Sequence, residues 1–180
     1  MKPVFVFVSA FVLASGVYGQ PRFGVSEADY ELAVRWLRTD CLAPDAKPLR
    51  DRLLSRRAAM QQAFLGALDQ GPTDEEVTQA KSAAAAHWRA QREVLDRAEL
   101  RQALPADQLQ ALQNQTEEEF VRSAAENFIN GYKSNAMSGL AVVGDDDALN
   151  RLRELAQHGD SPEAVAARGA LAYRESLAGR

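Results

Sequence analysis

Apolar residues recur at intervals of three and four along most of the chain, which is the pattern of amphipathic helices. Strand signals are nearly absent after the N-terminal segment, and no Asn-Gly or Asp-Gly turn joins two alternating apolar runs. The pattern therefore predicts an all-α fold of antiparallel helical hairpins. The expected helices cover residues 26–38, 48–70, 73–102, 106–114, 116–143, 145–158 and 161–178.

Several of these helices have clear start and stop signals. Three starts place a hydroxyl three residues before an acid, so that both side chains can bond the exposed amides of the first turn. The pairs are Ser26 with Asp29, Thr73 with Glu76, and Thr116 with Glu119. Glycine at Gly71, Gly144 and Gly159 is expected to end helices, because glycine tolerates the positive φ that a helix C-terminus often needs.

Two of the expected helices are long. Residues 73–102 repeat apolar positions every seven residues, but alanine and glutamine stand where a strong coiled coil has leucine. At 1.5 Å per residue this helix would reach roughly 40 Å. It either packs along the whole domain or projects as one arm of a hairpin. Its mixed surface charges favour packing, and we expect it to be the long central helix of the stack.

Residues 116–143 carry the richest apolar face in the chain, including Phe120, Phe128 and Tyr132. We expect this helix to be the central core element. Gly131 and Gly139 weaken a helix by roughly 0.5–1 kcal/mol each. Their presence predicts close helix packing or a bend near Gly131.

The C-terminal stretch, residues 133–178, alternates helix and tight turn. The acids at 145–147 stand where the next helix begins, and we interpret them as helix caps. They lack the spaced oxygens and the glycine of a calcium loop. Ser161, Pro162 and Glu163 form a typical start for the last helix.

This stretch resembles one HEAT-like repeat of the bilin-lyase-type HEAT family. The resemblance rests on Leu140, Gly144-Asp145, Ala148, Leu152, Asp160-Ser161-Pro162, Ala167 and Ala170-Leu171. It implies helical hairpins stacked as a short α-solenoid and a role as a protein-binding scaffold. Such repeats often carry an arginine early in the second helix, where this chain has Ala164 or Val165. Arg168 comes one turn late, so the resemblance does not extend to a regular arginine–aspartate ladder.

Residues 1–19 resemble a secretory signal peptide. Lys2 precedes the short apolar run 4–17, and small residues stand before a cleavage point after Gly19. We expect a periplasmic or secreted mature chain, residues 20–180, forming one domain without stable membrane insertion. Loss of Lys2 would leave 20 basic and 25 acidic residues, a net charge near −5. An acidic chain with scattered arginines argues against nucleic acid as the partner.

Cys41 is the single cysteine, so no internal disulfide can form. Two interpretations stay open. Cys41 is either a small buried apolar residue or the site of an intermolecular disulfide in a homodimer.

No motif for catalysis, cofactor binding or metal binding stands out. The two histidines, His87 and His158, are far apart, and Cys-x-x-Cys and His-x-x-x-His are absent. No Gly-x-Ser-x-Gly elbow or phosphate-binding glycine loop occurs. Four aromatic residues could line a groove for a peptide or glycan, although aromatics on amphipathic helices are usually core members. They are Trp36, Trp88, Tyr132 and Tyr173, of which Tyr173 is the strongest exception to a core role.

These observations favour an exported, non-enzymatic helical protein that binds another protein in the cell envelope and needs no cofactor. One alternative is a small envelope enzyme acting on cell-wall material through helix-borne carboxylates, such as those at 117–119 and Glu126. It would require two acids converging in a cleft, with at least one desolvated. Another alternative is an inhibitor or immunity-type protein whose partner is a single enzyme.

Overall fold

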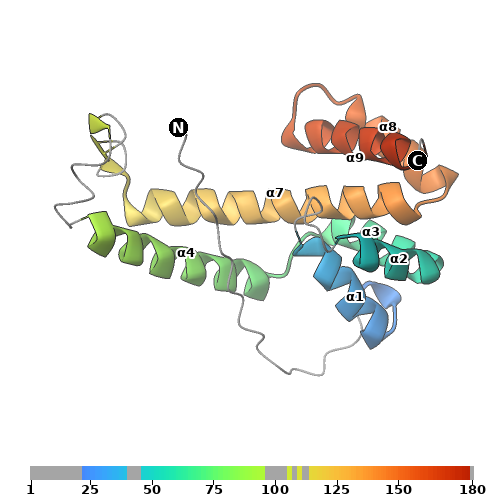
Figure 1. Ribbon diagram of the computed structural model, residues 1–180, viewed down its shortest axis with the longest axis horizontal. Helices are drawn as coiled ribbons and strands as arrows, with labels where there is room; N and C mark the ends of the chain where they lie inside the picture. The colour runs from blue at the N-terminus through green and yellow to red at the C-terminus, as the bar shows by residue number, and fades with distance from the viewer. Residues whose placement is uncertain (1–21, 40–45, 96–104, 107–108, 111–113, 179–180) are drawn as a thin grey trace.

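The computed structural model describes residues 22–39, 46–95, 105–106, 109–110 and 114–178 (Figure 1). Helices account for nearly all of these residues, and no strand occurs among them. A short 3-10 helix, η1 (Arg22–Gly24), precedes the α-helices. These are α1 (Glu27–Leu37), α2 (Ala46–Ser55), α3 (Arg57–Gln70), α4 (Asp74–Leu95), α7 (Glu117–Val143), α8 (Asp146–Ala156) and α9 (Pro162–Ala178). The all-α prediction is confirmed.

Helix α7 is the element that the others pack against. Its C-terminal half contacts α1, α2, α3, α8 and α9, and we call this group the head. Its N-terminal half runs beside α4, and these two helices form an arm that extends away from the head (Figure 1). The prediction that residues 116–143 form the core element is confirmed.

The prediction that residues 73–102 form the central helix is wrong. Helix α4, which covers the described part of that segment, packs extensively only against α7. Only Glu76 and Ala84 of α4 are buried, because alanine and glutamine offer little apolar surface for a second layer. The prediction that this helix packs along the whole domain is therefore also wrong. Helix α4 instead forms a hairpin with the N-terminal half of α7, and this hairpin is the arm.

Close packing at Gly139 joins α7 to α3. A Cβ atom at this position would lie 2.6 Å from the ring of Phe64, so only glycine fits without a shift of the ring. Phe64, Met137 and Leu140 are all fully buried beside this contact. Gly131, by contrast, faces open space, and α7 continues through it as one α-helix.

The C-terminus of α7 lies in the head, where its last carbonyl groups need partners. Arg57 of α3 donates to the carbonyls of Val143 and Gly144 at 2.7 Å each. Arg174 of α9 donates to the carbonyls of residues 141 and 142 at 2.9 and 3.0 Å. Two arginines from different helices thus satisfy four carbonyls and oppose the negative end of the helix dipole.

The helix expected over 48–70 is two helices. The backbone leaves the helical region at Arg56, with φ −125° and ψ 35°, between α2 and α3. The guanidinium of Arg56 lies 2.9 Å from the Asp29 carboxylate on α1. The break lets both α2 and α3 contact α7. The predicted apolar stripe is nevertheless buried: Leu49, Leu53, Met60, Phe64 and Leu68.

The C-terminal helices follow the predicted caps. The side chain of Asp145 accepts from the amide of Ala148, and Ser161 accepts from Ala164. Gly159 has the expected positive φ of 71°. Gly144 does not, since its φ is −64°; a Cβ there would instead lie 2.4 Å from the Leu140 carbonyl oxygen. Helices α8 and α9 pack against each other, and α9 packs on α7.

None of the helices within the described residues is long and apolar enough to cross a membrane. The expected signal segment, residues 1–19, and Cys41 lie outside the described residues. The short helix expected over 106–114 is only partly described, with residues 106, 109–110 and 114 helical.

Candidate functional site

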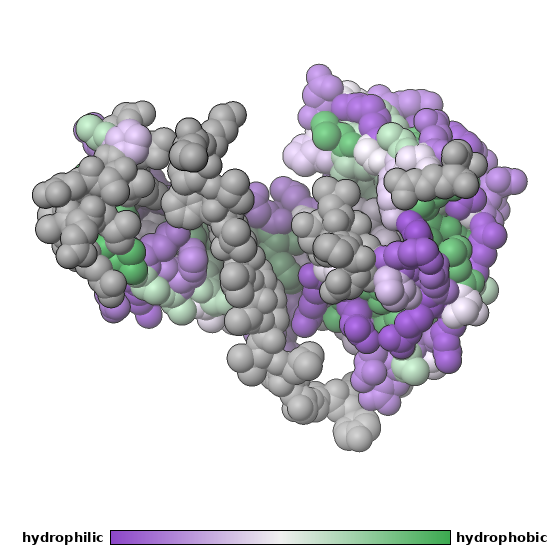
Figure 2. Space-filling view, in the orientation of Figure 1, coloured by the Kyte–Doolittle hydropathy of each residue, from purple (hydrophilic) through white to green (hydrophobic). Residues whose placement is uncertain are grey.

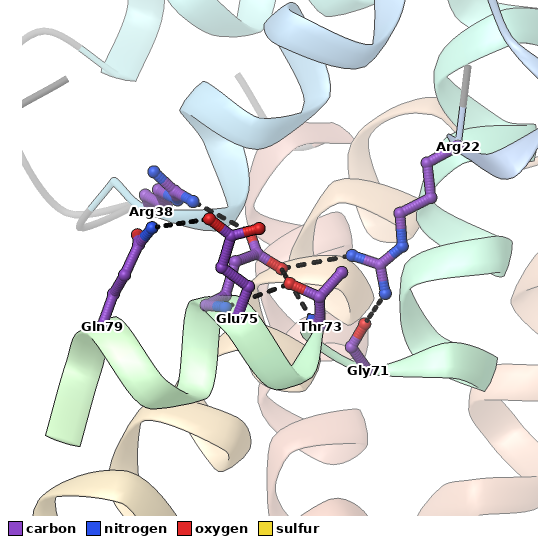
Figure 3. Close-up of polar contacts among 7 residues, drawn as sticks. Arg22, Arg38, Gly71, Thr73, Glu75 and Gln79 are labelled. Carbon is purple, nitrogen blue, oxygen red and sulfur yellow. Dashed lines mark hydrogen bonds and ion pairs between the residues drawn. The ribbon is translucent and has the colours of Figure 1, made fainter. Parts of the chain in front are cut away.

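A polar cluster centred on Glu76 lies at the base of the arm. Figure 3 labels its members Arg22, Arg38, Gly71 and Thr73. The Glu76 side chain is only 9% exposed. One carboxylate oxygen accepts from the Thr73 amide at 2.8 Å and from Arg22 of η1 at 3.2 Å, and the other accepts from Arg38 after α1 at 2.8 Å. Arg22 also donates to the Gly71 carbonyl at 2.6 Å. The cluster therefore joins η1, the end of α1 and the α3–α4 junction.

The electrostatics of Glu76 favour its charged form. Burial alone raises the pKa of this carboxyl. The Thr73 amide and the guanidinium groups of Arg38 and Arg22 more than offset burial and hold the pKa of Glu76 below its usual value. A carboxylate with this many donors is a poor proton acceptor, so the cluster is suited to fastening helices together.

Tyr132 of α7 lies within electrostatic reach of Glu76 and is 1% exposed. Its hydroxyl is the one buried side-chain polar atom of the described residues that has no hydrogen-bond partner. Burial, and secondarily the charge of Glu76, raises the pKa of Tyr132 far above that of an exposed tyrosine. The hydroxyl therefore remains protonated.

Within the described residues, the arm has few buried positions. Beyond the Glu76 cluster, Ala84 and Ala125 are the only buried residues of 77–95 and 117–131. Larger apolar side chains in these ranges are only partly covered. They are Val77, Trp88, Leu95, Phe120, Val121, Phe128 and Ile129, and Val94 is more exposed than these. Figure 2 shows hydrophobic and hydrophilic residues mixed on the visible face of the arm. Two helices alone do not bury these side chains as a bundle of three or four helices would.

Polar and aromatic contacts hold the two helices of the arm in register. Arg89 of α4 lies 2.6 Å from the Glu117 carboxylate of α7. His87 stacks on Phe120 with ring centroids 5.9 Å apart. Arg92 of α4 donates to the carbonyl of Gln115, just before α7, at 2.6 Å, while its guanidinium covers the ring of Trp88 within α4. These contacts define the relative position of α4 and α7 without removing their apolar atoms from solvent.

An open groove of about 500 Å³ runs between the helices of the arm. Its lining combines apolar and charged side chains: Lys81, Ser82, Ala85, Glu117, Glu118 and Val121. An apolar floor with charged edges suits an amphipathic segment better than a small molecule, which usually needs a more enclosed pocket.

The four aromatic residues named from the sequence do not line one groove. Trp36 is fully buried, and its indole N–H donates to the Asn135 carbonyl at 2.9 Å. Tyr132 is also a core residue. Tyr173 is half-buried against the head, and Trp88 is half-buried on the arm. Of these four aromatic residues, Trp88 is therefore the one that lies on the arm.

The remaining acidic residues singled out in the sequence do not come together in one site within the described residues. Within the described ranges, no group of three or more His, Cys, Asp and Glu side chains is placed to hold a metal ion. The acids at 145–147 begin α8, as expected. Glu119 completes the capping box with Thr116, and Glu117 and Glu118 line the groove of the arm.

Sequence reasoning recognised Glu76 as a cap but missed its two arginine partners. Arg22 and Arg38 are 54 and 38 residues away, so local spacing gives no signal for these contacts. The first predicted helix begins at residue 26, so the sequence assigned no core role to Phe23 and Val25, which are buried in the core. The presence of two apolar residues beside Arg22 was the one available hint.

The chain matches no protein-family model, and no curated protein and no solved structure matches it. No family match therefore supports the resemblance of residues 133–178 to a HEAT-like repeat. Fold and geometry carry the functional argument alone.

Proposed function

We propose that this chain is a non-enzymatic, protein-binding module of the cell envelope, and that the α4–α7 arm is its binding surface. A partner helix laid along the arm would complete a bundle and cover the apolar side chains that two helices leave half-exposed. The observation that carries the proposal is the contrast between the filled head and the open arm. In the head, Trp36, Phe64 and Leu140 are fully buried, whereas Trp88, Phe120 and Phe128 on the arm are not.

Other features support parts of this proposal. The apolar segment 4–17 after Lys2 supports export. The α8–α9 pair, with Asp145 and Ser161 as caps, is consistent with the HEAT-like repeat proposed for the C-terminal stretch. Such a repeat would support a scaffold role. In this proposal the head is the rigid support and the arm makes the contact.

The described carboxylates favour binding over hydrolysis. The two buried acids, Asp29 and Glu76, are each held by arginine and by a helix-capping hydroxyl or amide. Of the acids that line the arm groove, Glu118 is exposed, and Glu117 is partly exposed and paired with Arg89. A carboxylate-based cell-wall enzyme needs two acids that face one cleft, with at least one of them desolvated. The buried acids and the groove acids are different residues, so no described pair meets both conditions. An inhibitor or immunity-type role differs only in that the partner is one enzyme, and loss of the gene would then unmask a toxicity.

Site-specific photocrosslinking tests the proposal. A photoreactive amino acid replaces the exposed Ala86 on the arm, and a matched variant carries it at the exposed Ala172 of α9. Irradiation in the native envelope is expected to give a discrete adduct from position 86 and none from position 172. No adduct at position 86, or the same adducts from both positions, would refute the arm as the binding surface.

A further inference from the structure

Charge is unevenly distributed between head and arm. Residues 47–57, on α2 and the start of α3, contain one acid and five basic side chains, all exposed or half-exposed. We call them the basic patch: Lys47, Arg50, Arg52, Arg56 and Arg57. The arm has the opposite balance, with four basic side chains against seven acids besides the buried Glu76. The acids are Asp74, Glu75, Glu93, Glu117, Glu118, Glu119 and Glu126.

Each of these two surfaces also exposes an apolar side chain. Leu54 lies within the basic patch and is 46% exposed, although it is a large aliphatic residue. On the arm, Val94 is 40% exposed, and the groove that Glu117 and Glu118 edge has Ala85 and Val121 in its lining. The head thus presents an apolar residue in a segment with an excess of basic side chains, although Lys47 pairs with Asp51 and Arg56 pairs with Asp29. The arm presents a groove that Glu117 and Glu118 line together with Lys81, in segments with an excess of acidic side chains.

The two surfaces of one chain do not meet. Figure 1 shows α2 in the head, remote from the far end of the arm, and α2 makes its main contacts with α1, α3 and α7. Complementary surfaces that are separated in one molecule can pair between two molecules. If each head receives the other chain's arm, both pairs of surfaces are used at once and the assembly closes around a two-fold axis.

We propose that the first partner of the arm is a second copy of this chain, in a dimer in which each arm groove receives the other copy's α2 surface around Leu54. This inference rests on the proposed function, because it uses the arm as the binding surface and specifies what covers it. The groove is incomplete without the second copy, and opposite net charges orient the encounter. Association is therefore expected to weaken as salt screens these charges.

Charge reversal with rescue tests the dimer. The protein is expressed from its full coding sequence, purified after any natural processing, and its dissociation constant is measured by sedimentation velocity at low and high salt. One variant reverses the head (Lys47→Glu with Arg52→Glu) and another reverses the arm (Glu118→Lys with Glu126→Lys). These four side chains are exposed and take no part in a helix cap. The matched control is Glu175→Lys on the exposed side of α9.

Each reversed surface is expected to raise the dissociation constant at least about tenfold at low salt, which is within the range of like-charge contacts at an interface. The control should leave it unchanged, and the variant with both surfaces reversed should recover dimerisation to within about threefold of the original. Circular dichroism confirms that each variant retains its helix content.

A chain that is monomeric at every concentration, or a dimer that neither reversal weakens, would overturn this inference. Failure of the double reversal to restore association would overturn it as well. If the chain is monomeric but position 86 still crosslinks to another envelope protein, the self-association fails and the protein-binding function stands. If the chain is monomeric and position 86 gives no adduct, both fail.

Discussion

Replacing Glu76 by glutamine tests whether the cluster at the base of the arm fastens the head to α4. Glutamine keeps the shape of the side chain and one acceptor oxygen but removes the charge that faces Arg22 and Arg38. Each hydrogen bond to a charged group contributes about 1.5–3 kcal/mol, and breaking a fully buried ion pair costs about 3–5 kcal/mol. Arg22 and Arg38 are 18% and 33% exposed and can turn toward water, so the loss falls below the sum of these terms. We expect Glu76→Gln to lower the free energy of unfolding by about 2–3 kcal/mol.

Urea unfolding followed by circular dichroism at pH 7 measures this loss. The matched control is Glu75→Gln, because Glu75 is exposed and its bond to Gln79 lies within the same helix. The control is expected to change stability by no more than about 0.5 kcal/mol. If the Glu76 variant unfolds at the same urea concentration as the control, the cluster does not fasten these elements.

The stability difference between the original protein and Glu76→Gln should depend on pH. The fold holds the pKa of Glu76 below its ordinary value of 4.5, so the ionised carboxylate stabilises the native state. This contribution is complete above the pKa of the unfolded chain and is lost as pH falls through the lower pKa of the folded chain. The stability difference between the original protein and Glu76→Gln should therefore be constant from pH 7 to about 5.5 and shrink below 4.5. A difference that grows on acidification would show the opposite sign of pKa shift.

Three further changes test the packing of α7, each by urea unfolding. Gly139→Ala should destabilise by about 1–3 kcal/mol because its Cβ would meet the ring of Phe64, while Gly131→Ala, facing open space, should stabilise by about 0.5–1 kcal/mol. Equal effects at the two glycines would contradict the close approach of α3 and α7. Tyr132→Phe removes a buried hydroxyl without a partner, so stability should stay equal or rise by up to about 1 kcal/mol; a loss above that size would mean that the hydroxyl is bonded. Arg174→Met leaves two carbonyls at the end of α7 without their donor and should cost about 1–3 kcal/mol, and an unchanged midpoint would rule out this capping role.

Local signals predicted the helices well, because helix caps act over three or four residues. Ser26, Thr73, Thr116, Asp145 and Ser161 all accept hydrogen bonds from the predicted first turns. The break at residue 56 was missed because the apolar stripe continues across it, and its contact with α1 is not local. Gly144 has no positive φ; its lack of a side chain serves close approach to the preceding turn, which a cap rule does not distinguish.

The arrangement of the helices was less predictable than their positions. The apolar face of residues 116–143 identified the central helix, since that face was wide enough to contact several neighbours. Length suggested the same role for residues 73–102, but buried area decides, and an alanine-rich stripe supports contact with one helix only. The arginine partners of Glu76 required the folded chain, because they come from segments that are distant in sequence.

Hydrogen exchange of the dilute protein, measured by mass spectrometry, tests the claim that the fold leaves its arm uncovered. Amides of residues 80–92 and of residues 134–142 both lie inside continuous helices, so helix formation alone would protect them equally. The open arm predicts that residues 80–92 exchange at least about tenfold faster than residues 134–142, which corresponds to about 1.4 kcal/mol in opening free energy. Equal protection of the two segments would mean that the arm is already covered within one chain, and it would contradict the account.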